Sequence, residues 1–129
     1  MNADERRLSP KPEPRFSIGV GRRASAVAQA VRKELRQLMW DCAGIVRTDA
    51  GLARAGARLA ELACGSEGST ERLSPYCLET ANLLTVARLI VSCARSRKES
   101  RGLHFNQDHP EKDDRYKKDT VVTLEDRLD

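Results

Sequence analysis

Apolar residues recur at steps of three and four in separated stretches of the chain, which is the spacing of one face of an α-helix. The first stretch follows Ser25, a residue type that caps helices, and extends to about Cys42. The second begins after Thr48 or Asp49, either of which can serve as a cap, and is rich in alanine. Gly44 interrupts the apolar spacing between them. The pattern therefore predicts two amphipathic helices joined by a short crossing at residues 45–47.

A third apolar stretch starts at Ser74-Pro75 and extends to about Glu99. Pro at the first helical position loses only an N–H that would be unpaired anyway, so this pair favours a helix start. Apolar residues cover more than one face of the stretch, so we expect it in the middle of an assembly. Gly102 follows directly and is the usual helix stop. The three stretches predict an all-α fold, an antiparallel three-helix bundle over residues 24–100.

The two ends of the chain carry few apolar residues. Residues 1–23 contain three prolines and several charges, and such a segment buries too little surface to offset the entropy of ordering it. We expect a disordered or loosely attached arm there, and a flexible loop at residues 65–70. Residues 101–129 are expected to be an extended segment. Either this segment or a partner domain covers the remaining apolar strip of the third helix.

Charged residues make up 33% of the chain and aromatic residues only 4%, so the core must be aliphatic. The net charge of +4 could attract nucleic acid, but so few aromatic side chains leave little for bases to stack on. No apolar run reaches the roughly 18 residues of a membrane span, and the charged start lacks the apolar core of a secretory signal. We therefore expect a cytoplasmic protein without a membrane or nucleic-acid partner.

Cysteine and histidine spacing gives no metal-binding pattern. The four cysteines lack any Cys-x-x-Cys pair, and we interpret them as reduced thiols. His104 and His109 lie five residues apart across a loop that ends in proline. No Ser, Cys or carboxylate stands in a recognisable catalytic relation to His104. We predict no metal site and no catalytic residue in this chain.

Three stretches of sequence carry a resemblance to a known family. Met39-Trp40-Asp41 leads into Gly44-Ile45-Val46-Arg47, and Asn82-Leu83-Leu84 lies in the third helix. The run from Arg97 to Phe105 reads Arg-Lys-Glu-Ser-Arg-Gly-Leu-His-Phe and precedes Asp108-His109-Pro110-Glu111. In this order the chain resembles the C-terminal helical domain of the flavin-dependent L-aspartate oxidases. Succinate dehydrogenase and fumarate reductase flavoprotein subunits carry a similar module. Cys42 departs from the oxidase pattern, which more often has an aromatic residue there.

The resemblance implies a parent enzyme that oxidises L-aspartate to iminoaspartate with FAD, the first step toward quinolinate and NAD. The parent's flavin-binding domain would be the partner of this module. FAD itself requires a strand, a Gly-x-Gly-x-x-Gly turn and a helix start. The nearest approach here is Ile18-Gly19-Val20-Gly21, where Ala24 replaces the third glycine. We therefore expect the chain to bind no cofactor and to be inactive alone.

Five residues near the helix ends are the candidates for a functional site. Arg47 lies at the crossing between the first two helices, and Arg101 lies beside Gly102. Each guanidinium can bind a carboxylate or exposed helix-end carbonyls. The resemblance places these residues in flavin-domain docking or in the wall of the parent's active site, against the alternative that they are internal struts. The full set is Arg47, Ser100, Arg101, Gly102 and His104.

Two alternative functions stay open. The module could belong to a succinate dehydrogenase or fumarate reductase flavoprotein subunit, although Leu103 and the sequence around Trp40 favour the oxidase. It could instead be a free-standing basic helical adaptor of acidic protein or nucleic acid. Salt-dependent binding to duplex DNA, without binding to a flavin domain, would identify the adaptor.

Overall fold

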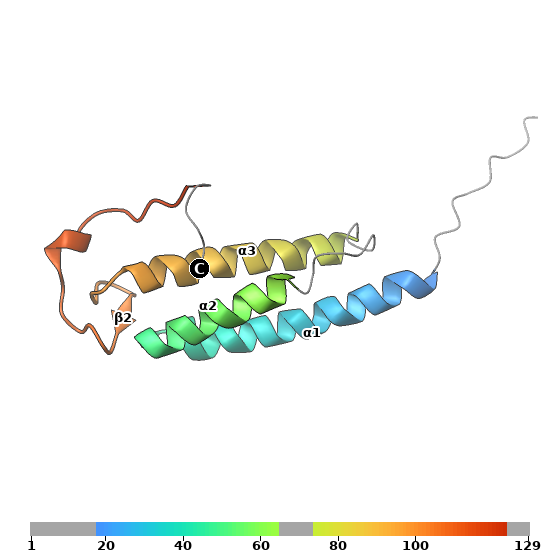
Figure 1. Cartoon of the computed structure of the whole chain (residues 1–129), viewed down its shortest axis with the longest axis horizontal. Helices are drawn as coiled ribbons and strands as arrows, with labels where there is room; N and C mark the ends of the chain where they lie inside the picture. The colour runs from blue at the N-terminus through green and yellow to red at the C-terminus, as the bar shows by residue number, and fades with distance from the viewer. Residues whose placement is uncertain (1–17, 65–73, 124–129) are drawn as a thin grey trace, which may run out of the picture.

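The structure is a computed structural model that describes residues 18–64 and 74–123. Three helices account for most of this part of the chain: α1 (Ile18–Ala43), α2 (Asp49–Cys64) and α3 (Pro75–Ser96). They lie side by side, and each runs in the direction opposite to the helix before it (Figure 1). The all-α three-helix bundle predicted from apolar spacing is confirmed.

The core is aliphatic, as the scarcity of aromatic residues predicts. Each helix contacts the other two, and the buried side chains come from all three. Leu52 and Leu59 of α2 are fully buried, and Val91 of α3 is 1% exposed. Small residues between the larger ones allow the helix backbones to approach closely. The core residues are Leu35, Cys42, Ala43, Leu52, Ala55, Leu59, Leu84, Ala87, Val91 and Ala94.

Local sequence signals set most of the helix ends. Ser74 caps α3 and accepts a hydrogen bond from the backbone N–H of Cys77, with Pro75 in the first helical position. Thr48 caps α2 in the same way, through the N–H of Gly51. Gly44 follows the last residue of α1, where a Cβ would lie 2.6 Å from the carbonyl oxygen of Trp40. A larger residue would therefore displace the end of α1.

Two helix bounds differ from those predicted. α1 begins at Ile18, so Ser25 lies inside the helix and is not its cap. Arg22, Arg23 and Ala24 have high helix propensity and no proline interrupts them, which extends the helix beyond its apolar pattern. α3 ends at Ser96, three residues before the expected end at Glu99. The rest of the expected arm, residues 1–17, and the loop expected at residues 65–70 lie outside the described residues.

One face of α3 stays uncovered in the described part of the chain. Leu83, Val86 and Ile90 are 43% to 51% exposed, and α3 is long and apolar enough to cross a membrane by length and composition. The lengths of the uninterrupted apolar runs in the sequence did not indicate a helix of this length and composition. Five α3 residues are nevertheless buried in the bundle. The chain after α3 passes beyond the end of the bundle and then returns alongside the last part of α3 (Figure 1). Even so, it leaves Leu83, Val86 and Ile90 exposed.

Candidate docking site at the end of the bundle

Two short strands close the end of the bundle, and no periodicity in the sequence indicated them. β1 (Val46–Arg47) crosses between α1 and α2, and β2 (Phe105–Asn106) follows the loop after α3. They pair in parallel, with Val46 opposite Phe105 and Arg47 opposite Asn106. The N–H of Gln107 extends the ladder by donating to the carbonyl of Arg47 at 2.9 Å. This pairing brings the candidate residues Arg47 and His104 together, although 57 positions separate them.

Arg47 joins the end of α1 to the loop after α3. Its Nε donates to the carbonyls of Ala43 and Gly44, which have no partner within the helix. Its terminal nitrogen lies 2.7 Å from Nδ1 of His104. Since a guanidinium only donates, Nδ1 must accept, and Nε2 of His104 then donates to the carbonyl of Arg97 at 3.2 Å. The geometry therefore requires neutral imidazole.

The electrostatics agree with a neutral His104. Burial lowers its pKa below the ordinary value of 6.5, and the nearby charges of Arg47 and Arg97 lower it further, against the opposing effect of the Arg97 carbonyl. Burial also lowers the pKa of Arg47. A proton added to His104 would convert the Nδ1 acceptor into a donor facing Arg47. This histidine is a strut between two arginines in the present arrangement.

Ser100 is the centre of the loop after α3. Its hydroxyl accepts from the N–H of Asn106 at 2.9 Å and lies 2.8 Å from the carbonyl of His109. Its own N–H donates to the carbonyl of Glu111 at 3.0 Å. Ser100 is 9% exposed and Asn106 fully buried. The hydroxyl and the backbone N–H of Ser100 thus tie residues 106, 109 and 111 together, so Ser100 has a structural part in this loop.

The loop also attaches to the start of α2 through Asp49. The carboxylate accepts from Lys98 at 2.8 Å, from His109 at 2.9 Å and from Asn106 at 2.9 Å. The Lys98 hydrogen bond is the largest cause that holds the pKa of Asp49 well below its usual range, followed by those of His109 and Asn106. The backbone N–H of Asp49 donates in turn to Asp108 at 2.7 Å. Sequence reasoning considered Asp49 only as a cap.

Glu99 is the buried charge of this region, and sequence reasoning missed it. Its side chain has no exposed surface, and Nε of Arg101 donates to both of its oxygens at 3.1 and 3.0 Å. Arg97 and the backbone N–H of Asp113 donate as well, each at 3.0 Å. The Arg101 hydrogen bond is the largest cause that lowers the pKa of Glu99 to about 2. The sequence around Glu99 does not reveal that its side chain is buried, because only the folded loop buries the carboxylate.

Gly102 and Leu103 form the exposed tip of the loop. Arg101 and His104 exchange backbone hydrogen bonds across them, and Gly102 has φ +59°, the left-handed conformation that glycine adopts without a Cβ penalty. Leu103 is 94% exposed. The structure therefore brings all five predicted site residues to one end of the bundle, where four of them hold the loop and Gly102 turns it.

Several large apolar side chains are exposed around this corner. Val46 and Phe105 are opposite each other on β1 and β2, and Leu103 lies two residues before Phe105. Ile45 is 81% exposed and Trp40 78% exposed, on the segment that ends α1 and enters β1. We refer to Trp40, Ile45, Val46, Leu103 and Phe105 as the apolar end residues. Exposed apolar side chains gathered beside a rigid polar framework are typical of a docking surface.

Cofactor and metal sites have little support in the described residues. Ile18, Gly19, Val20 and Gly21 lie within α1, so this segment is helix and not a phosphate-binding turn between a strand and a helix. Residues 18–64 and 74–123 also contain no group of three or more His, Cys, Asp or Glu side chains placed to hold a metal ion. Cys42, Cys77 and Cys93, all within these described residues, form no disulfide. Residues 18–21 therefore do not fit the pyrophosphate of FAD.

Comparison with known proteins shows the family. Residues 32–129 match the family model of the fumarate reductase flavoprotein C-terminal domain. The chain belongs to this family. Its relatives include the L-aspartate oxidase of Vibrio cholerae, 50% identical over 80 residues that cover 60% of this chain and 15% of the relative. The L-aspartate oxidase of Acinetobacter baylyi is 45% identical over 95 residues, 70% of this chain and 17% of the relative.

More distant relatives carry the same enzyme name. The L-aspartate oxidase of Streptomyces coelicolor is 33% identical over 122 residues, which cover 89% of this chain and 21% of the relative. The chain thus spans about a fifth or less of the length of these relatives. The match confirms the resemblance found in the sequence, including its lean toward the oxidase rather than the fumarate reductase subunit. Most of each relative has no counterpart in this chain.

Proposed function

We propose that this chain is the C-terminal helical module of an L-aspartate oxidase-like flavoprotein and that it acts by docking on the flavin-binding domain. The parent enzyme would oxidise L-aspartate to iminoaspartate with FAD bound by that domain. The observation that carries the proposal is the identity of 45% to 50% between this chain and L-aspartate oxidases. The aligned region is only about a sixth of the length of each relative. We place the protein in the cytoplasm and expect it to be inactive alone.

The apolar end residues are the surface that we assign to docking. The side chains of Arg47, Ser100, Arg101 and His104 form hydrogen bonds within the corner, so they fix its shape. Leu103 at the tip and Phe105 on β2 are then held toward solvent. A preorganised surface loses little conformational entropy on binding, which favours a stable domain contact. The five predicted site residues would thus act mainly by positioning their apolar neighbours.

A binding experiment with two matched variants tests this assignment. The full chain is titrated against the separately produced, FAD-loaded flavin domain of the Vibrio cholerae relative, with aspartate-dependent peroxide formation as a second readout. Leu103→Asp should abolish or weaken association by at least about tenfold, because it places a charge in an apolar contact. Val27→Asp, at a 64% exposed position of α1 outside the corner and outside the α3 strip, is the control and should have a small effect.

The opposite pattern would change the conclusion. Loss of binding with a third variant, Ile90→Asp on the uncovered strip of α3, but not with Leu103→Asp would transfer docking to that strip. If the unaltered chain binds no flavin domain and binds duplex DNA in a salt-dependent way, the proposed module would be wrong and the chain would be the basic adaptor. All three variants change exposed residues, so circular dichroism should show unchanged helix content.

A further inference from the structure

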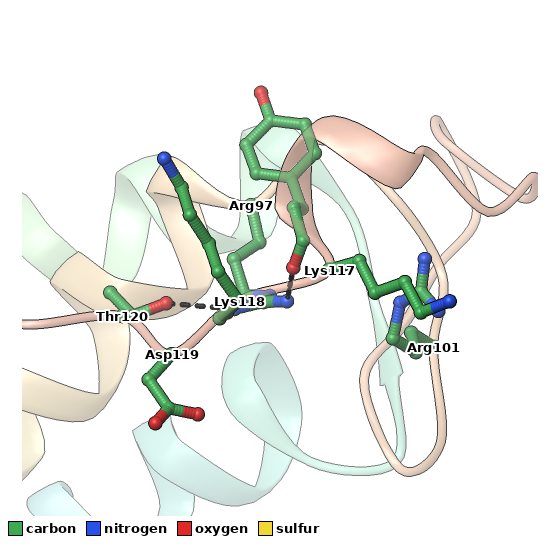
Figure 2. Close-up of a pocket in the computed structure, with 7 residues that line it drawn as sticks. Arg97, Arg101, Lys117, Lys118, Asp119 and Thr120 are labelled. Carbon is green, nitrogen blue, oxygen red and sulfur yellow. Dashed lines mark hydrogen bonds between the residues drawn. The ribbon is translucent and has the colours of Figure 1, made fainter.

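A second feature of the molecule is a pocket that Arg97 and Arg101 help to line. The segment after the 3₁₀ turn η2 (Asp114–Tyr116) passes beside the end of α3 and encloses an open pocket of about 580 Å³. Figure 2 shows its lining, in which basic side chains predominate. The lining residues are Arg97, Arg101, Tyr116, Lys117, Lys118, Asp119 and Thr120.

Two guanidinium groups form the fixed part of the pocket. Arg97 donates to the carbonyls of Tyr116 and Lys118 and to the hydroxyl of Thr120. Arg101 is held by the buried carboxylate of Glu99, which Arg97 shares. The side chains of Arg97 and Arg101 are only 20% and 29% exposed. Because these contacts restrict both arginines, their positive charge is preorganised and not spread over many rotamers.

The lysines add mobile charge at two places. Lys117 extends toward Arg101, whereas Lys118 extends to the other side of Arg97 (Figure 2). Both lysines are exposed, and within residues 18–64 and 74–123 neither forms an ion pair with a carboxylate. The pocket therefore presents one pair of cations, Arg101 and Lys117, beside the guanidinium of Arg97 (Figure 2). Such an arrangement suits a ligand with two linked anionic groups.

The balance of charge supports the same ligand. Four cations face three carboxylates, the buried Glu99, the pocket residue Asp119 and Asp114, which pairs with Arg101, so a surplus of one positive charge remains. Asp113 is already paired with Arg115, and Asp114 is 92% exposed at 3.7 Å from Arg101. We propose that this pocket binds a diphosphate group, either as free pyrophosphate or as part of a nucleoside diphosphate. The pocket volume lies within the range of small-ligand sites.

Titration of the full chain with pyrophosphate at low ionic strength tests the proposal by calorimetry and by amide chemical shifts. We expect saturable one-to-one binding, with the largest shifts at Arg101, Lys117 and Thr120. Lys117→Gln should weaken binding by about tenfold, the effect of losing one charge-assisted contact. Lys112→Gln removes the same charge from the same segment outside the pocket, and should weaken binding less than about twofold.

Further arms distinguish the sources of the diphosphate and the ways the proposal can fail. Tighter binding of ADP than of pyrophosphate would indicate a nucleotide, and equal binding would indicate free diphosphate. An equal loss with Lys112→Gln would show attraction by net charge alone and overturn the site. Orthophosphate, succinate or a Glu-rich peptide binding as tightly as pyrophosphate would overturn the assignment to a diphosphate. Both substituted lysines are exposed, so misfolding does not obscure these outcomes.

Discussion

The helical core and the loop corner at its end are stabilised by opposite kinds of contact. In the core, Leu52, Leu59 and Val91 belong to one cluster of buried apolar side chains. In the corner, the fully buried residues are Glu99 and Asn106, each held by hydrogen bonds from several directions. Apolar contacts tolerate small shifts, whereas a buried carboxylate must keep its donors in place. The corner is therefore the part of the molecule whose geometry is defined most narrowly.

The largest effect is expected from truncating the core. Leu59→Ala removes most of a fully buried side chain and should lower the free energy of unfolding by about 2 to 5 kcal/mol. Helix signal by circular dichroism and corner amides by NMR should then be lost together in one transition. Val86→Ala, on the half-exposed face of α3, is the matched control and should change stability by less than about 0.5 kcal/mol. Separate transitions would show that the corner folds independently of the core.

The core could be predicted from sequence because its signals are local. Leu52 and Val91 belong to apolar positions three and four residues apart, and Ser74 and Gly44 mark helix ends by their own chemistry. The contacts of the corner join Asp49 to His109 and Arg47 to His104 across more than 50 positions. No period in the sequence encodes such pairs.

The candidate site was accordingly located but not explained. The sequence run containing Ser100, Arg101, Gly102 and His104 was identified. Gly102 was expected to stop the third helix, but α3 ends at Ser96 and Gly102 turns the loop that follows. The carboxylate that Arg101 binds, that of Glu99, was not identified from the sequence, because a glutamate in a loop is usually exposed. The parallel pair of β1 and β2 was also missed, because strands of two residues have no detectable alternation.

A smaller and more local effect is expected from Glu99→Gln. The substitution keeps the size of the side chain but removes the charge that Arg97 and Arg101 share, so it should loosen the corner while the helices stay folded. Amide hydrogen exchange measures this directly, and protection of the Asp113 N–H should fall by about tenfold or more. Glu34→Gln removes an ion pair between exposed side chains, Glu34 and Arg58, and should leave corner protection unchanged. Uniform loss of protection along all helices would show that the corner and the core open as one unit.

The smallest effect is a pH dependence that comes from His104. Its pKa is below 6.5 in the folded chain, mainly because of burial, so between that lowered value and 6.5 the unfolded chain binds more protons. Stability should therefore decrease as pH falls below about 6.5 and stop decreasing from this cause once the folded pKa is passed. Urea unfolding at a series of pH values measures the slope. His104→Gln can accept from Arg47 and donate to the Arg97 carbonyl without titrating, so it should flatten the slope. An unchanged slope in His104→Gln would show that the imidazole between the two arginines is not the group that titrates.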